Sequence, residues 1–334
     1  MFGEFELIQA IRQHLQIRNQ DILLGIGDDA AIVKSFLKKD LIFTTDMLIE
    51  KVHFCMDWIT PKQLGVKSMA VNISDCAAMG AHPVAATISL GIPVGCSKAM
   101  ILDFYSGIEE IGKKFSVSVV GGDTVKSPCW VINIALIGWV EQEKALQRSR
   151  AQVGDAVFVT GTLGDSSAGL KLLEENFKKT FNQQEQFLIQ RHLSPSPRCE
   201  VGRYLAQYKL AHSAIDISDG LSSEIHHICQ ESGVGAEIHE SALPTSTELQ
   251  QFCNQHFYKI TDLVFHGGED YELLFTVSPQ QISKVLNELV PQTGIACKSI
   301  GRILPKSQGV SWIDMKGHRS PLKALGFDHF QANE

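Results

Sequence analysis

Segments with strand-like and helix-like apolar spacing follow one another along this chain without a strict β-α-β alternation. In the first part, strands are expected at 30–33, 41–46, 48–54, 84–92, 117–123 and 130–140. Helices are expected there at 5–16, 61–81 and 98–115. This order is the strongest constraint on the fold, and it favours α+β domains over a doubly wound parallel sheet.

The carboxy-terminal part repeats the mixture of strands and helices. Strands are expected at 156–161, 213–218, 271–277, 296–304 and 309–314. Helices are expected at 166–176, 184–192, 197–207, 219–232 and 279–290. A polar tract at 141–155 without a long apolar repeat separates the two parts. We therefore expect two domains, residues 1–145 and 146–334, as the length of 334 residues also suggests.

Charge and composition exclude several classes of protein. The net charge of −7 argues against a nucleic-acid-binding protein, which would normally carry a basic patch. No apolar run approaches the ~18 residues of a membrane-spanning helix, and the amino terminus lacks the apolar stretch of a signal peptide. The eight cysteines are scattered without zinc-ligand spacing, so we expect reduced thiols in a cytoplasmic protein.

Six short motifs combine an acidic residue with neighbouring glycine, serine or threonine. They are GIGDDAA (25–31), FTTDML (43–48), NISDCAAMGA (72–81), VGGDT (120–124), AIDISDGL (214–221) and HGGEDYEL (266–273). Carboxylate and hydroxyl oxygens suit Mg²⁺, which commonly bridges to phosphates. Glycines let the backbone approach a phosphate closely. The chain lacks both a lysine-bearing phosphate loop and a dinucleotide fingerprint. If phosphates bind here, metal ions must therefore supply most of the positive charge.

Each motif also has a purely structural explanation. Asp28 could cap a turn, Asp75 could face water, and Gly121–Gly122 could be turn residues. Adjacent carboxylates such as Asp28 and Asp29 nevertheless repel each other, by about 4 kcal/mol at ~4 Å and an effective dielectric constant of ~20. Six acidic motifs of one kind favour a site for metal and phosphate over six unrelated turns.

In this order, the six motifs and the terminal GFDHF resemble the thiamine-monophosphate kinase family, a relative of aminoimidazole-ribonucleotide synthetase and selenophosphate synthetase. The resemblance covers nearly the whole chain. It implies a two-domain, PurM-like α+β fold whose amino-terminal domains pair in a homodimer. It also implies Mg²⁺-dependent transfer of a phosphate from ATP to thiamine monophosphate, the last step of thiamine diphosphate biosynthesis.

The resemblance also implies roles for individual residues. Catalysis, by positioning and charge neutralisation without a general base, would rest on Asp46, Asp75, Asp123 and Arg148. Metal ligands would be Asp29, Thr44, Thr45, Asp46, Asp75, Asp123, Asp216 and Asp219, with Asp28 ranked below Asp29. ATP contacts would be Tyr105, Gly122, Asp123, Arg148 and Ser218. The thiamine phosphate site would hold His53, Glu269 and Phe327.

Three of these roles have alternatives. Phe327 would stack on the thiazolium or the pyrimidine ring, or else fill a core. His53 would lie near a phosphate or simply on a strand face, and Glu269 would balance the thiazolium charge or bind the pyrimidine. The chain departs from the family at RSRA, where Arg150 replaces a usual glycine, and this departure bears on the assignment of Arg148.

Other functional classes fit the sequence less well. Selenophosphate synthetase carries a reactive cysteine in an early glycine-rich loop, whereas the first cysteine here is Cys55. The hydrogenase-maturation relative ends in a cysteine-bearing tail, whereas this chain ends in HFQANE. A non-catalytic nucleotide- or Ca²⁺-binding regulator would bind ATP without turnover, and an assay would distinguish it.

Overall fold

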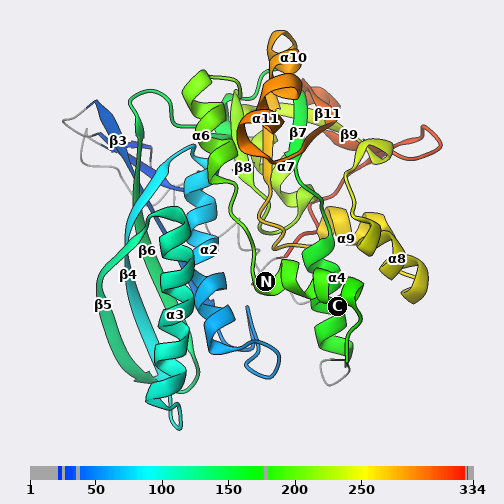
Figure 1. Ribbon diagram of the computed structural model, residues 1–334. Coiled ribbons are helices and arrows are strands. Elements are labelled where there is room, and N and C mark those ends of the chain that lie inside the picture. Colours follow the sequence, from blue (N-terminus) through cyan, green and yellow to red (C-terminus); the bar gives the residue numbers. More distant parts are fainter. Residues whose placement is uncertain (1–21, 25–26, 35–37, 177–179, 328, 330–334) are drawn as a thin grey trace.

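Two mixed β-sheets organise the chain, and helices pack against both of them (Figure 1). The first part of the chain forms a six-stranded sheet and the second part a seven-stranded sheet. The computed structural model describes residues 22–24, 27–34, 38–176, 180–327 and 329. The helix expected at 5–16 lies outside these residues.

The six-stranded sheet has the order β1-β2-β3-β6-β4-β5. Its strands are β1 (Ile22–Leu24), β2 (Ala31–Lys34), β3 (Lys39–Ile49), β4 (His82–Pro93), β5 (Ser118–Ser127) and β6 (Val131–Glu141). All neighbours are antiparallel except β4 and β5, which are parallel. Inward and outward residues alternate along β3, where Ile42 is buried and its neighbours Leu41 and Phe43 are exposed. One face of this sheet is therefore covered and the other is open.

Where two strands were expected at 41–46 and 48–54, the structure has a single strand, β3, so that prediction was wrong. β3 pairs with β6 without interruption over all eleven of its residues. The strand ends because the chain turns back at Lys51, which has a positive φ of 68°. His53 consequently lies in a turn instead of in a strand.

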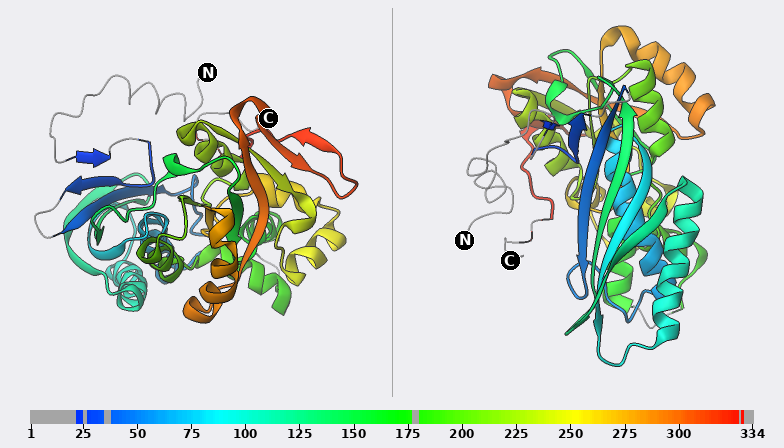
Figure 2. Two further views of the ribbon diagram at one scale, coloured as in Figure 1. Left: turned by 90° about the horizontal axis from the view of Figure 1, so that it is seen from above. Right: turned by 90° about the vertical axis from the view of Figure 1, so that its left-hand side faces the viewer.

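Two long helices, α2 (Pro61–Ala78) and α3 (Lys98–Phe115), cover the inner face of the six-stranded sheet (Figure 2). Both were expected from the sequence. α2 begins with a capping box between Thr60 and Gln63, and it ends just before Gly80, whose φ is +68°. The two helices approach closely through Gly65 and Gly107.

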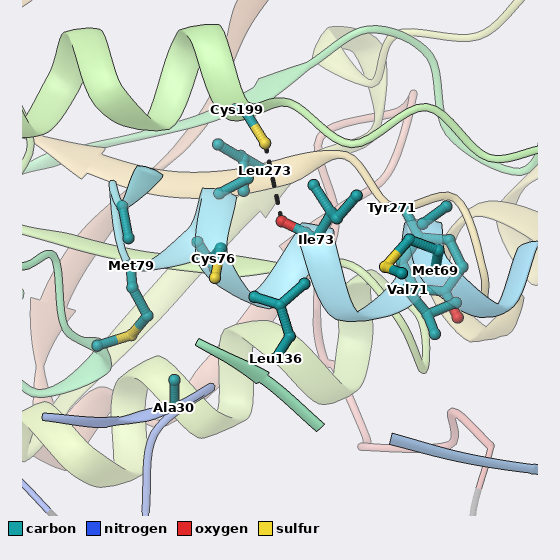
Figure 3. Close-up of a cluster of buried hydrophobic side chains, with 14 of the residues drawn as sticks. Ala30, Met69, Val71, Ile73, Cys76, Met79, Leu136, Cys199, Tyr271 and Leu273 are labelled. Atoms are coloured by element: carbon teal, nitrogen blue, oxygen red, sulfur yellow. Dashed lines mark hydrogen bonds between the residues drawn. The ribbon is translucent and has the colours of Figure 1, made fainter. Parts of the chain in front are cut away.

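α2 is buried on nearly all sides because it also touches the second part of the chain. Figure 3 shows Ile73 and Cys76 of α2 between Leu136 of β6 on one side and Leu273 of β10 (Leu273–Val277) on the other. The Cys199 thiol, at the start of α6 (Cys199–Tyr208), donates a weak hydrogen bond to the Ile73 carbonyl oxygen at 3.8 Å. One hydrophobic cluster therefore spans both sheets through α2.

The seven-stranded sheet has the order β13-β12-β9-β11-β7-β10-β8. Besides β10, its strands are β7 (Ala156–Thr160), β8 (Ser213–Asp216), β9 (Val234–His239), β11 (Cys297–Pro305), β12 (Val310–Ile313) and β13 (Arg319–Pro321). Besides α6, its helices are α4 (Asp165–Asn176), α5 (Gln183–Leu193), α7 (Leu221–Ser232), α8 (Thr247–His256), α9 (Ile260–His266), α10 (Ile282–Lys284) and α11 (Val290–Thr293). Every residue of β7 and β10 is buried, so helices or loops cover both faces at the centre of this sheet.

Most strands and helices expected in the second part are present, but β9, β13, α8 and α9 were not anticipated. The helix expected at 279–290 is a composite, in which a π-helical stretch (Val285–Leu289) separates α10 from α11. The polar tract at 141–155 connects the two sheets and contains a short 3-10 helix, η1 (Arg148–Arg150). The division at residues 145 and 146 stays a prediction.

Two further sequence-based expectations concern the environment of the protein. Among the described residues, none of the helices has both the length and the apolar character needed to cross a membrane. All eight cysteines are free thiols, and four of them are buried.

The contact between α2 and α3 generates a stability prediction. A Cβ atom on Gly107 would lie 1.9 Å from the Lys62 carbonyl oxygen, so Gly107→Ala must push the helices apart. We expect a loss of about 2 kcal/mol in the free energy of unfolding, measured by urea denaturation. The control Ser106→Ala changes the exposed neighbour and should stay within about 0.5 kcal/mol of the wild type. A Gly107→Ala protein as stable as the wild type would contradict this packing.

Candidate active site

Three carboxylates from distant parts of the sequence meet between the two sheets. Asp29 lies in the turn before β2, Asp75 lies in the last turn-and-a-half of α2, and Asp216 ends β8. One carboxylate oxygen from each lies within 4.8 Å of the others. The sequence motifs predicted all three as metal ligands, and the fold brings them together at a spacing that a single cation can bridge.

Hydroxyl groups surround this acidic cluster. The Thr44 hydroxyl donates to an Asp75 carboxylate oxygen, and it lies 3.2 Å from the Asp29 carbonyl oxygen. The Ser74 hydroxyl donates to Asp216 Oδ2 at 2.6 Å. Asp46 lies two residues after Thr44 in β3, on the same inner face, and its backbone N–H donates to Asn72 Oδ1 at 3.1 Å. The cluster is therefore rich in hard oxygen donors.

Burial and mutual repulsion raise the pKa values of these acids. Burial, followed by the charges of Asp46, Asp216 and Asp29, raises the pKa of Asp75 well above its ordinary value. Burial and Asp29 likewise raise the pKa of Asp216 well above the ordinary value, and that of Asp46 to about 6. Full ionisation of the cluster near neutral pH is therefore unfavourable without a cation, which is the electrostatic character of a divalent metal site.

Arg148 neutralises part of the adjacent acidic pair. Its Nε and a terminal guanidinium nitrogen donate to the two carboxylate oxygens of Asp29, at 3.2 and 2.7 Å. Its backbone N–H donates to Asp28 Oδ2 at 2.9 Å. Burial alone would lower the pKa of Arg148, but Asp29 and Asp28 outweigh it and raise that pKa. The positive charge of Arg148 therefore offsets part of the repulsion between Asp28 and Asp29.

Asp28 differs from Asp29 in its contacts and not in its exposure, because both side chains are 1% exposed. Burial and the charge of Asp29 raise the pKa of Asp28 to about 7. Because Asp28 Oδ1 also accepts the backbone N–H of Asp29 at 3.0 Å, its carboxylate shapes the turn and holds Arg148. The ranking of Asp29 above Asp28 as a metal ligand stays a prediction that this geometry favours.

The loop between β8 and α7 places Ser218 and Asp219 beside a buried acid that the sequence analysis missed. Glu224 Oε1 accepts the Asp219 backbone N–H at 2.9 Å and the Ser218 hydroxyl at 3.3 Å. Burial and the charge of Asp219 raise the pKa of Glu224 well above its ordinary value. The only sequence signal for Glu224 was an acidic residue in the first turn of a helix.

The residues predicted for thiamine phosphate lie near one another. His53 Nε2 and His329 Nε2 are 3.3 Å apart, and the His329 ring also meets the Phe327 ring edge-on, with centroids 4.7 Å apart. The tail reaches this position because the Phe327 backbone N–H donates to the Asp219 carbonyl oxygen at 3.1 Å. This hydrogen bond and the two ring contacts place the described tail residues Phe327 and His329 against the body of the protein. Burial and His329 lower the pKa of His53.

Glu269 belongs to the same region, since its charge acts on His53. Its carboxylate lies 2.9 Å from Lys67 Nζ and 3.1 Å from His192 Nδ1. Sequence analysis missed His329, Lys67 and His192. His329 stood inside the quoted GFDHF motif, but the other two had no signal beyond being polar residues inside helical segments.

Four predicted residues do not reach the acidic cluster within one chain. The Thr45 side chain points to the outer face of the sheet. Gly122 and Asp123 lie in edge strand β5. Across the sheet, the pairing register aligns Gly122 with Asp46, and three strand spacings separate their backbones by about 14 Å. Tyr105 of α3 follows Phe104, whose backbone packs against Gly65 of α2. Gly65 lies ten residues before Asp75 in α2, which corresponds to about 15 Å along the helix axis.

Arg150 lies on a separate cavity behind η1, of about 590 Å³. None of the acidic-cluster residues lines this cavity. The departure from the family at Arg150 therefore leaves the Arg148–Asp29 pair intact.

Both parts of the chain match known family domains. Residues 27–140 match "AIR synthase related protein, N-terminal domain", and residues 152–314 match "AIR synthase related protein, C-terminal domain". These matches confirm the expected PurM-like, two-domain α+β fold.

Curated relatives cover almost the full length. The chain is 38% identical over 332 residues to a thiamine-monophosphate kinase of Buchnera aphidicola subsp. Schizaphis graminum, covering 98% of this chain and 99% of the relative. It is 37% identical over 328 residues to a thiamine-monophosphate kinase of Escherichia coli K12, covering 98% of each.

Solved structures agree with the sequence matches. One described as AaThiL complexed with AMPPCP and TMP has a TM-score of 0.86 and 36% identity, covering 98% of this chain and 97% of that one. The thiamine-monophosphate kinase of Stenotrophomonas maltophilia K279a has a TM-score of 0.77 and 35% identity, covering 93% and 96%. The resemblance drawn from the motifs is confirmed: the chain belongs to the thiamine-monophosphate kinase family.

Proposed function

We propose that this protein transfers the γ-phosphate of ATP to the phosphate of thiamine monophosphate, giving ADP and thiamine diphosphate. The observation that carries the proposal is the cluster of Asp29, Asp75 and Asp216. Arg148 pairs with Asp29, and the helix that carries Asp75 also carries Lys67, the partner of Glu269. A phosphate oxygen of the acceptor attacks the γ-phosphorus directly, and the bond to the ADP oxygen breaks. Because that oxygen is already anionic, no side chain has to act as a general base.

The oxygen donors around the cluster fit Mg²⁺. Carboxylates of Asp29, Asp75, Asp216 and Asp46, with the Thr44 hydroxyl, would hold it, and Asp219 lies on the adjoining loop. Bound there, Mg²⁺ would neutralise phosphate charge that the chain has no lysine loop to neutralise. Arg148 would add a fixed positive charge, and Ser218 would lie beside the nucleotide.

We also propose a homodimer formed through the six-stranded sheet. Its outer face exposes Leu41, Phe43, Met47 and Ile137, and nearly every residue of β5 is exposed. Uncovered apolar surface of this kind marks an interaction site. A second copy would also explain how Asp123, Gly122 and Tyr105 could serve a site that they do not reach within their own chain.

The acceptor site would be built by His53, Glu269 and Phe327. The exposed part of the Phe327 ring suits stacking on one of the substrate rings. A cytoplasmic location belongs to the same proposal, because all eight cysteines are free thiols, as in reducing compartments.

The direct test is to incubate the protein with ATP, Mg²⁺ and thiamine monophosphate and to measure thiamine diphosphate and ADP. Unphosphorylated thiamine serves as the control acceptor and should not react. ATP binding without formation of thiamine diphosphate would support the regulator instead and reject the kinase.

Asp75→Asn should abolish most activity without unfolding the protein. Loss of an outer-shell partner of a metal already costs up to about 100-fold, so loss of a ligand should cost at least that in kcat. The substituted amide can still accept the Thr44 hydroxyl while it removes a charge from a repulsive cluster, so the metal-free unfolding temperature should not fall. Asp103→Asn is the matched control, because Asp103 lies on the exposed face of α3. Near-normal turnover by Asp75→Asn would reject the metal assignment.

Metal-free protein should lose stability as pH rises. The pKa of Asp46 is raised from 3.8 to about 6 and that of Asp28 to about 7, so the folded state binds protons more tightly than the unfolded chain. This contribution is complete below about pH 4 and is lost as pH rises through 6 to 7. Thermal unfolding across this range checks it. Added Mg²⁺ should raise the midpoint more at pH 7.5 than at pH 5, and equal shifts would contradict the model of a deprotonated ligand set.

Phe327→Ala should raise KM for thiamine monophosphate roughly tenfold and leave KM for ATP unchanged, because a stacking contact is worth about 1.5 kcal/mol. Leu325→Ala, two residues earlier and more exposed, is the matched control. A change confined to the KM for ATP would contradict the assignment of Phe327 to the thiamine monophosphate site.

A further inference from the structure

Lys67 is a fully buried lysine in α2, with none of its side chain exposed. Its ammonium lies 2.9 Å from Glu269 Oε2 and 3.4 Å from His192 Nε2. Burying a charged ammonium is costly unless it is paired, so this residue needs a reason to be a lysine. None of the roles described above uses it.

Lys67 cannot touch a substrate from this position, but Glu269 can. The Glu269 side chain is 25% exposed, whereas that of Lys67 is 0% exposed. Any effect of Lys67 on a bound molecule must therefore pass through Glu269.

The neighbouring histidine completes a fixed arrangement. An ammonium only donates hydrogen bonds, so His192 Nε2 accepts and Nδ1 carries the proton. Ser166 Oγ and Glu269 Oε2 each lie 3.1 Å from that Nδ1. Burial and Lys67 lower the pKa of His192 to about 3, which keeps this ring neutral. Burial favours a protonated Glu269, but the charge and the hydrogen bond of Lys67 oppose it, and the pKa of Glu269 is lowered. The cluster thus contains one cation and one anion.

The backbone at Glu269 is also constrained. Its φ is +64°, a left-handed conformation that residues other than glycine rarely adopt. Its N–H donates to the Ser218 carbonyl oxygen at 2.7 Å, and a Cβ on Gly268 would lie 2.3 Å from that same oxygen. A strained loop of this kind persists only where its surroundings hold it, and the ion pair with Lys67 is one such restraint.

The ion pair also joins the two family domains. Lys67 belongs to the amino-terminal match, whereas Glu269 and His192 belong to the carboxy-terminal match. Lys67 and Asp75 are eight residues apart in one continuous helix, which corresponds to about 12 Å along its axis. The helix therefore fixes the spacing between the backbone that carries Lys67 and the backbone that carries Asp75.

We propose that Lys67 is a positioning residue, which fixes the Glu269 carboxylate at a set distance from the acidic cluster and so determines how well thiamine monophosphate fits. This inference rests on the proposed function. It assigns Lys67 no contact with either substrate.

Lys67→Met tests the proposal, because methionine fills similar space without a charge. KM for thiamine monophosphate should rise about tenfold or more, as expected when one partner of a buried charge pair is removed, while KM for ATP stays unchanged. Lys62→Met is the matched control, since Lys62 lies on the exposed side of α2 in a surface pair with Glu110. An unchanged KM for thiamine monophosphate in Lys67→Met, or an equal rise for both substrates, would overturn the proposal.

A double-mutant cycle with Glu269→Gln separates positioning from simple packing. If Lys67 acts through Glu269, Lys67→Met should add nothing to the KM change already caused by Glu269→Gln. Independent effects that multiply would reject the proposal. The double variant buries no unpaired charge, which keeps the test available if Lys67→Met alone fails to fold.

Failure of the proposed function would be visible separately, because the wild-type protein would then not form thiamine diphosphate. In that case the same cycle is measured on urea unfolding. A coupling between Lys67 and Glu269 there supports the restraint, and its absence rejects it.

Discussion

Mutual repulsion among three closely spaced acids is the constraint around which this molecule is arranged. Asp29, Asp75 and Asp216 come from a turn, a helix and a strand end, and burial together with neighbouring carboxylates disfavours the charged forms of Asp75 and Asp216. The surrounding structure compensates with Arg148, with the hydroxyls of neighbouring threonine and serine side chains, and with two sheets packed on one helix. Carboxylates held together in this way attract a cation more strongly than carboxylates that are free to move apart on the surface.

The distribution of charge also separates the two ends of the site. At the acidic cluster, the negative charge of the carboxylates exceeds the positive charge of Arg148, so a cation would be needed to complete the balance. At Glu269 the balance is already complete, because Lys67 matches the carboxylate. The acidic cluster therefore carries an uncompensated negative charge, whereas the charge of Glu269 is compensated by a residue of the chain itself.

Much of this organisation could be predicted from the sequence. α2 could be predicted from Pro61 in its first turn and Gly80 at its end, and α3 from its amphipathic spacing. The acidic motifs stand out because their neighbours are small. The failures have physical causes. The sequence analysis divided β3 into two strands because the continuous pairing of β3 with β6 depends on tertiary structure. It missed Lys67 and Glu224 because the burial of a single charged residue leaves no local sequence pattern. The distance between Asp46 and β5 depends on strand order, which periodicity does not contain.

The burial of α2 between the sheets has a consequence for how the protein folds. The hydrophobic cluster that includes Ile73 and Leu136 continues without a break to Phe275 and Leu205 in the other family domain. Around α2, the two family domains share one hydrophobic core. The polar tract between them therefore does not separate two units that unfold independently. The halves should behave as one folding unit, in which loosening of either sheet exposes the same helix and separates the carboxylates of Asp29, Asp75 and Asp216.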